Sequence, residues 1–178
     1  MKKGILIIFI TLLLGNFISA QTYKYVGADK CKACHNKAAS GEQYNKWIKD
    51  PHSQAIKTLT GQKAMDYGKK NGIADPSKEA KCLKCHSTYD IADPKLRATI
   101  LATEGVSCES CHGPGSAYKA IPVMRSHDLF LQNGGIVPNK ELCLKCHGSK
   151  ENPFFKEFNY EASLAKIAHP NPEKGKHN

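Results

Sequence analysis

The residues with the clearest chemistry are four copies of the pentapeptide Cys-x-x-Cys-His. They span residues 31–35, 82–86, 108–112 and 143–147. Two thiols at this spacing add across the two vinyl groups of haem, and the histidine that follows reaches the iron from the same side. The pattern therefore predicts four covalently attached c-type haems.

The motifs account for every cysteine of the chain, which are Cys31, Cys34, Cys82, Cys85, Cys108, Cys111, Cys143 and Cys146. A single Cys-x-x-Cys-His could instead be half of a zinc site or a redox dithiol. Four copies, each followed by histidine, favour haem over these alternatives. No cysteine is left over for a disulfide.

The histidines predict how the irons are coordinated. Each motif supplies one ligand, and these are His35, His86, His112 and His147. Four more histidines lie outside the motifs: His52, His127, His169 and His177. His52 follows the helix break at Asp50-Pro51 and lies close to the only tryptophan. His177 is one residue from the C-terminus, where disorder is the default.

We therefore expect His52, His127 and His169 to be distal ligands. Three haems would then have two histidine ligands, and one haem would have an open or weakly held sixth position. His177 and Met124 are the alternative ligands for that position, although Met124 is more readily explained by packing.

The first twenty residues have the pattern of a secretory signal peptide. Lys2 and Lys3 precede an apolar run from Ile5 to Leu14, and Ile18-Ser19-Ala20 resembles a cleavage site before Gln21. The alternative is an uncleaved anchor, but the run is shorter than the roughly 20 residues of a spanning helix. We expect a periplasmic protein in which residues 21–178 form one tetrahaem domain.

The net charge of +10 does not by itself indicate a nucleic-acid partner. Without Lys2 and Lys3 the balance is 24 − 16 = +8, and four haems carry eight propionates, about −8 when all are ionised. Seven lysines could still form a basic face near the first motif that steers an acidic redox partner, or could simply be solvated. They are Lys24, Lys30, Lys32, Lys37, Lys46, Lys49 and Lys57.

The predicted fold is mainly α, with short helices and long loops around four stacked haems and little or no β. The mature chain has 178 − 20 = 158 residues, about 40 for each haem, so the porphyrins must supply much of the buried apolar surface. We therefore expect the apoprotein not to fold. Helices are expected over residues 36–50, 54–59, 62–70, 94–105 and 161–168, and from the turns at 75–77 and Asn139 into the second and fourth motifs.

Several blocks carry a family resemblance: Tyr25-Val26-Gly27, the spacing of Trp47 and His52, and residues 104–115 around the third motif. Together with His127 and His169, they resemble the tetrahaem cytochrome c family that accepts electrons from hydroxylamine oxidoreductase. The resemblance implies a five-coordinate haem at the second motif, whose iron is held by His86. It also implies that His127 serves the first motif, His169 the third and His52 the fourth, with the haems stacked in close pairs.

Two classes of function remain open. The first is an electron carrier that relays electrons between a respiratory or redox enzyme and an acceptor, which two histidine ligands per iron favour because they leave no place for substrate. The second is an enzyme that reduces a small nitrogen-oxide ligand, such as nitric oxide, at the His86 haem, with Lys84 or Tyr89 nearby. We prefer the carrier. A carrier of this kind could also be a subunit of a larger complex or an oligomer. The segments around the second motif and between the third and fourth motifs are shorter than in the family, so the resemblance does not identify the redox partners.

Overall fold

The protein is an assembly of short helices, as the computed structural model shows for residues 22–148, 152, 154–169, 171 and 172. The predicted signal peptide and His177 lie outside the described residues. The α-helices are α1 (Ala28–His35), α2 (Gln43–Trp47), α3 (Ala55–Thr58), α4 (Gln62–Lys70), α5 (Ala80–His86), α6 (Thr88–Ile91), α7 (Cys108–His112), α8 (Ile121–Met124), α9 (His127–Gln132), α10 (Lys140–His147) and α11 (Tyr160–Ile167). Three 3₁₀ turns are η1 (Ala38–Ser40), η2 (Pro51–Gln54) and η3 (Pro94–Leu96).

Polar side chains define where several helices begin. Asn139 accepts the Leu142 N–H at 2.9 Å at the start of α10, and Asn159 accepts the Ala162 N–H at 2.8 Å at the start of α11. Such caps satisfy backbone donors that have no partner inside the helix. These caps confirm the predicted start of the helix that carries the fourth motif and that of the helix near residue 161. Helix α4 also has the predicted bounds.

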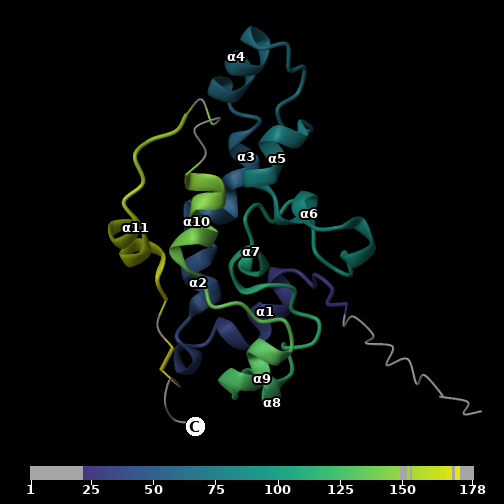
Figure 1. Cartoon of the computed structure of the whole chain (residues 1–178), viewed down its shortest axis with the longest axis vertical. Helices are drawn as coiled ribbons and strands as arrows, with labels where there is room; N and C mark the ends of the chain where they lie inside the picture. Colours follow the sequence, from purple (N-terminus) through teal and green to yellow (C-terminus); the bar gives the residue numbers. More distant parts are fainter. Residues whose placement is uncertain (1–21, 149–151, 153, 170, 173–178) are drawn as a thin grey trace, which may run out of the picture.

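The helices that end in the four motifs pack in pairs. Helix α1 lies against α7, and α5 lies against α10. The molecule is elongated, with α4 at one end, α8 and α9 at the other, and the motif helices between them (Figure 1). The segment that leads into α11, and α11 itself, run along one side of this arrangement (Figure 1).

Regular β-structure is almost absent from the part of the chain that the structure describes. There the only bridge outside helices joins Tyr25 to Arg97 in parallel orientation. The prediction of a mainly α fold with short helices and long loops is confirmed.

The helix predicted over residues 94–105 is wrong. Only the turn η3 forms, and the chain then passes beside Tyr25, where Tyr25 N–H donates to Leu96 O at 2.8 Å and Ala98 N–H donates to Tyr25 O at 2.9 Å. The Thr99 hydroxyl donates to Val26 O at 2.6 Å. Pairing with a distant segment thus satisfies backbone groups that a helix would have satisfied locally.

The helix predicted over residues 36–50 is also wrong as one element. It is divided into η1 and α2 by Gly41 and Glu42, whose φ angles are +98° and +53°. A right-handed helix cannot continue through two residues with positive φ. Glycine adopts this conformation at little cost, and Gly41 therefore ends the first segment.

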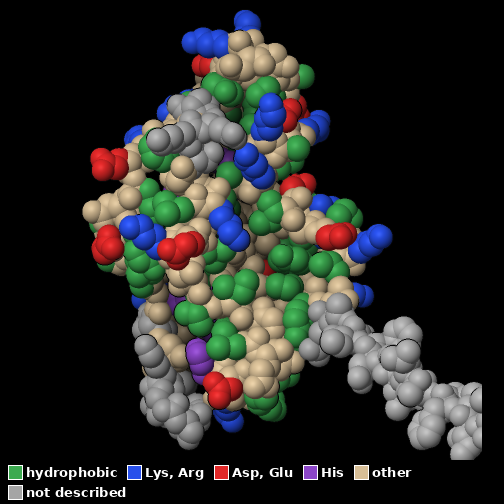
Figure 2. Space-filling model, in the orientation of Figure 1, with side chains coloured by type: hydrophobic (Ala, Val, Ile, Leu, Met, Phe, Trp, Pro, Cys, Tyr) green, Lys and Arg blue, Asp and Glu red, His purple; other side chains and the backbone are tan. Residues whose placement is uncertain are grey.

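The buried apolar core is small. Among the described residues it consists of Val26, Ala28, Leu59, Ala92, Ile100 and Tyr118. Fourteen large hydrophobic side chains of the described residues are exposed, from Ile48, which directly follows α2, to Leu164 in α11. Hydrophobic side chains accordingly appear over much of the face shown in Figure 2, between lysines and acidic residues.

Candidate haem sites

Each Cys-x-x-Cys-His motif lies at the C-terminal end of a helix, and the third motif makes up the whole of α7. Helices α1, α5, α7 and α10 end at His35, His86, His112 and His147. In a helix, residues three and four positions apart share a face, so both thiols and the imidazole of one motif lie on the same side. All eight cysteines are free thiols in the structure.

The Nδ1 atoms of three motif histidines have hydrogen-bond partners from other parts of the chain. His35 Nδ1 lies 3.1 Å from Gln43 Oε1, His86 Nδ1 lies 2.8 Å from Ala55 O, and His112 Nδ1 lies 3.3 Å from Ile136 O. An Nδ1–H donor in such a bond leaves the unprotonated Nε2 available to a metal and fixes the ring orientation.

Two pairs of histidine rings face each other across the fold. The ring centroids of His52 and His147 are 5.8 Å apart, and those of His112 and His169 are 5.9 Å apart. A metal ion bonded at about 2 Å to one nitrogen of each ring places the centroids roughly 6 Å apart. Each pair joins a motif histidine to one outside the motifs, in the combination that the family resemblance implies.

Burial favours the neutral form of these rings. It lowers the pKa of His112, with His169 adding to the effect, and lowers the pKa of His147, with His52 adding to the effect. The pKa of His169 is lowered by burial and by His35 and Lys46. Neutral imidazole is the form that binds iron, so the lowered pKa values favour the form of these histidines that can act as ligands.

His127 does not face another histidine ring among the described residues. Its side chain is 68% exposed at the start of α9, where Nδ1 lies 3.8 Å from Asp128 Oδ1. His35, its expected counterpart, lies near His112 and His169 instead, as its effect on their pKa values indicates.

No histidine ring is placed opposite His86 within the described part of the chain. His86 hydrogen-bonds to α3 through Ala55 O and lies 3.1 Å from the Thr58 hydroxyl. Met124 is in α8, far along the molecule from α5 (Figure 1), so it is not placed to reach an iron held by His86. Tyr89 stacks against Arg97, whose guanidinium carbon is 4.1 Å from the ring centroid.

Thiols of different motifs also lie close together. The Cys31 and Cys108 thiols are close enough to interact, and this interaction, with burial, raises the pKa of Cys108. Burial and the nearby Cys85 thiol raise the pKa of Cys146 to about 12. The pKa of Cys111 is raised mainly by burial and, to a smaller extent, by the nearby Cys143 thiol.

These neighbours define an order for the attachment sites. The first motif adjoins the third, the third adjoins the fourth, and the fourth adjoins the second. The packing of α1 on α7 and of α5 on α10 agrees with this order.

Two carboxylates that sequence reasoning did not single out hold the first motif against the third. Buried Glu109, between the two cysteines of the third motif, accepts the N–H groups of Val26, Gly27 and Gly115 at 2.6–3.1 Å. Glu104 accepts the Ala28 N–H at 2.8 Å, and burial raises its pKa. Their place in the Glu104-to-Gly115 block was a visible signal, but their partners Val26, Gly27 and Ala28 lie 76–83 residues away in the sequence.

The residues present fit haem. The motif helices present thiols and imidazoles on one side, the facing rings have the separation of two axial ligands, and exposed apolar side chains such as Leu144 and Ile136 lie in or beside the motif segments. Within the described ranges, no group of three or more histidine, cysteine or acidic side chains is arranged to bind a bare metal ion. None of the described helices has the length and apolar character needed to cross a bilayer.

Comparison with known proteins agrees with this chemistry. Residues 30–113, which include the first three motifs, match the family model described as cytochrome c554 and c-prime. The chain is 29% identical over 145 residues to cytochrome c-554 of Nitrosomonas europaea, a match that covers 76% of this chain and 57% of that relative. No solved structure matches the chain. The resemblance to the cytochrome c554 family, and with it the assignment as a multihaem cytochrome c with covalent haem as cofactor, is confirmed.

Proposed function

We propose that the protein is a periplasmic electron carrier that relays electrons through four covalent haems between a redox enzyme and an acceptor. The observation that carries the proposal is the continuous series of attachment sites, in which thiols of the first and third, third and fourth, and fourth and second motifs are neighbours. Electron exchange between haems requires such proximity. Haem iron supplies the one-electron chemistry when bound.

Paired histidines keep three of the four irons closed to substrate. We assign His147 and His52 to the fourth haem, His112 and His169 to the third, and His35 and His127 to the first. The ring separations of 5.8 and 5.9 Å support the first two assignments. The third is supported by the family resemblance, and it requires exposed His127 to turn toward the first motif.

Export to the periplasm is part of the proposal. Residues 1–20 have the signal-peptide pattern, and covalent haem attachment takes place outside the cytoplasm. The seven lysines between residues 24 and 57 are all exposed, which suits a docking partner with an acidic surface.

A second candidate function is reduction of a small ligand such as nitric oxide at the second haem. It is favoured by one observation, that among the described residues no histidine ring faces His86. Against it, Tyr89 is engaged by Arg97. The carrier remains the better supported function.

The experiment is spectroscopy of the haem-loaded protein with and without carbon monoxide or nitric oxide. We expect optical and electron paramagnetic resonance spectra of three low-spin haems and one high-spin haem that binds gas. A matched variant, His127→Ala, should add a second high-spin signal. A wholly low-spin wild type that binds neither gas would contradict the open site and implicate His177.

The same samples separate the two functions. A carrier should exchange electrons with redox proteins through all four haems and show no turnover of nitric oxide when an electron donor is supplied. Sustained consumption of nitric oxide that depends on the donor would instead establish the enzyme.

A further inference from the structure

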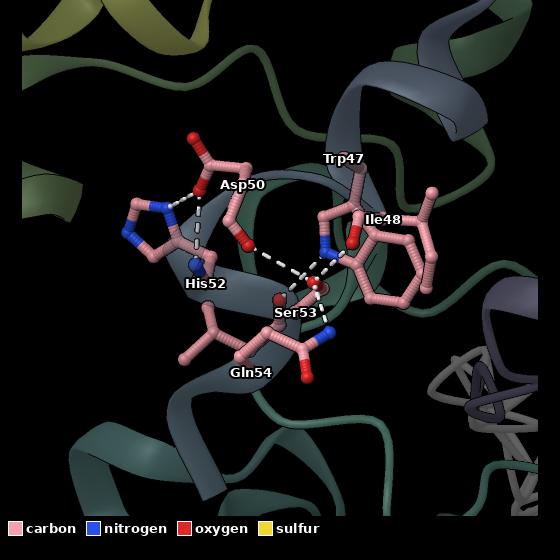
Figure 3. A network of polar contacts seen from close by, with 7 residues as sticks. Trp47, Ile48, Asp50, His52, Ser53 and Gln54 are labelled. Atoms are coloured by element: carbon pink, nitrogen blue, oxygen red, sulfur yellow. Dashed lines mark hydrogen bonds and ion pairs between the residues drawn. The ribbon is translucent and has the colours of Figure 1, made fainter. Parts of the chain in front are cut away.

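A carboxylate lies directly behind one of the histidines assigned to iron. Asp50 Oδ1 is 2.7 Å from His52 Nδ1 and also accepts the His52 backbone N–H at 2.9 Å. The Asp50 side chain is only 18% exposed. Figure 3 shows the carboxylate beside Nδ1, while the other ring nitrogen of His52 points away from it.

This arrangement differs from that of the other histidines in the described residues. The Nδ1 partners of His35, His86 and His112 are a glutamine amide oxygen, two backbone carbonyls and the Thr58 hydroxyl, all uncharged. Asp128 is the other carboxylate near a histidine, but it lies 3.8 Å from His127 Nδ1 and is 86% exposed. Among the histidines of the described residues, His52 is therefore the one with a short contact to a largely buried carboxylate.

The surrounding contacts hold Asp50 and His52 in place. Asp50 O accepts the Ser53 N–H at 3.1 Å and the Ser53 hydroxyl at 2.9 Å (Figure 3). His52 O accepts the Val106 N–H at 2.9 Å, and Val106 O accepts the Trp47 indole N–H at 2.9 Å. The turn is thus fastened to the segment that precedes the third motif.

We propose that Asp50 is a positioning residue that lowers the reduction potential of the fourth haem by making His52 a stronger electron donor to its iron. A carboxylate that accepts the Nδ1–H bond gives the imidazole imidazolate character, which raises its basicity and stabilises ferric iron. The negative charge in a sheltered position acts in the same direction. The inference rests on the proposed ligation by His52 and His147.

The position of the fourth motif gives this effect a consequence for the relay. It adjoins both the third motif, through Cys111 and Cys143, and the second, through Cys85 and Cys146. Asp50 would therefore act on the haem that lies between the third haem and the second. A lower reduction potential at this fourth haem would favour electrons on its neighbours.

The test is spectroelectrochemical titration of the haem-loaded Asp50→Asn variant. Asparagine keeps the size and the capping oxygen of aspartate but removes the charge. We expect one of the four reduction potentials to shift upward while the count of low-spin haems is unchanged. Four unchanged potentials, or conversion of a low-spin haem to high spin, would overturn the inference.

The matched control is Asp93→Asn. Asp93 begins a similar Asp-Pro turn, in which Oδ1 accepts the Lys95 N–H at 2.8 Å, but no histidine follows. The four potentials should match those of the wild type. An upward shift as large as that of Asp50→Asn would show a general charge effect and would overturn the role of the His52 contact.

A second variant separates this inference from the proposed ligation. His52→Ala should convert one low-spin haem to high spin if His52 is a ligand. Unchanged spectra would remove the ligation on which the inference depends. A new high-spin signal in His52→Ala, together with unchanged potentials in Asp50→Asn, would leave the ligation intact and overturn only the role of Asp50.

Discussion

At the scale of single residues, the turn after the third motif depends on glycine. Gly113 follows His112 with φ +78° and ψ 171°, a region that is essentially restricted to glycine. Its carbonyl accepts the Tyr118 hydroxyl at 2.7 Å. A Cβ at Gly113 would overlap the carbonyl oxygen of Gly134 and press on Ile136, whose own carbonyl accepts from His112.

Gly113→Ala should consequently destabilise the protein by more than a glycine substitution at an open site. We expect a loss of about 1 kcal/mol for Gly72→Ala, where φ is +70° but no atom lies within 4 Å of the added Cβ. Gly113→Ala should lose a further 1–3 kcal/mol, roughly the cost of overpacking. Guanidinium unfolding of the haem-loaded variants measures both, and equal losses would contradict the steric argument.

At the scale of elements, helix α1 begins without a cap of its own. Gly27 precedes it and provides no side-chain hydrogen bond. The first backbone donors are instead satisfied by Glu104 and Glu109, which come from the segment around the start of α7. The carboxylates therefore cap one motif helix and join it to another at once.

Glu109→Ala should separate these two helices. The substitution leaves three backbone N–H groups at residues 26, 27 and 115 without their acceptor, and each unsatisfied buried donor costs about 1–3 kcal/mol. We expect a loss of about 3 kcal/mol or more in unfolding free energy, against less than about 0.5 kcal/mol for Glu141→Ala at an exposed site. Similar midpoints for the two variants would show that the buried carboxylate does not hold α1.

At the scale of the whole molecule, apolar burial between side chains is too limited to support the fold alone. In the described ranges only six hydrophobic residues are buried, whereas fourteen large hydrophobic side chains are exposed. Porphyrins covalently fixed at four sites would cover part of that exposed surface and supply the missing burial. Folding and haem attachment should be coupled, as metal binding and folding are in small metal-dependent domains.

Expression of the mature chain without haem attachment should therefore give an unfolded polypeptide. Far-ultraviolet circular dichroism should show much less helix than the haem-loaded protein, and unfolding should lack a cooperative transition. A cooperative, helical apoprotein would contradict the role assigned to the porphyrins.

Short-range features of the chain were predictable from the sequence. The cofactor follows from Cys-x-x-Cys-His because its spacing alone places two thiols and an imidazole on one side of a helix turn. The starts of α10 and α11 follow from Asn139 and from the aromatic-to-helical change near residue 160, since capping acts within a few residues. The helix expected after Pro94 failed because pairing with Tyr25, some seventy residues away, replaced local hydrogen bonds.

Only the tertiary structure decided which parts of the chain meet. His52 and His147 lie far apart in the sequence, and no local pattern predicts that their ring centroids lie 5.8 Å apart. The same holds for the contact of Cys31 with Cys108 and for the carboxylates that cap α1. Motif spacing determined what each site binds because that chemistry is local. Long-range packing determined the order of the sites and the partners of each histidine, because those depend on how the whole chain closes on itself.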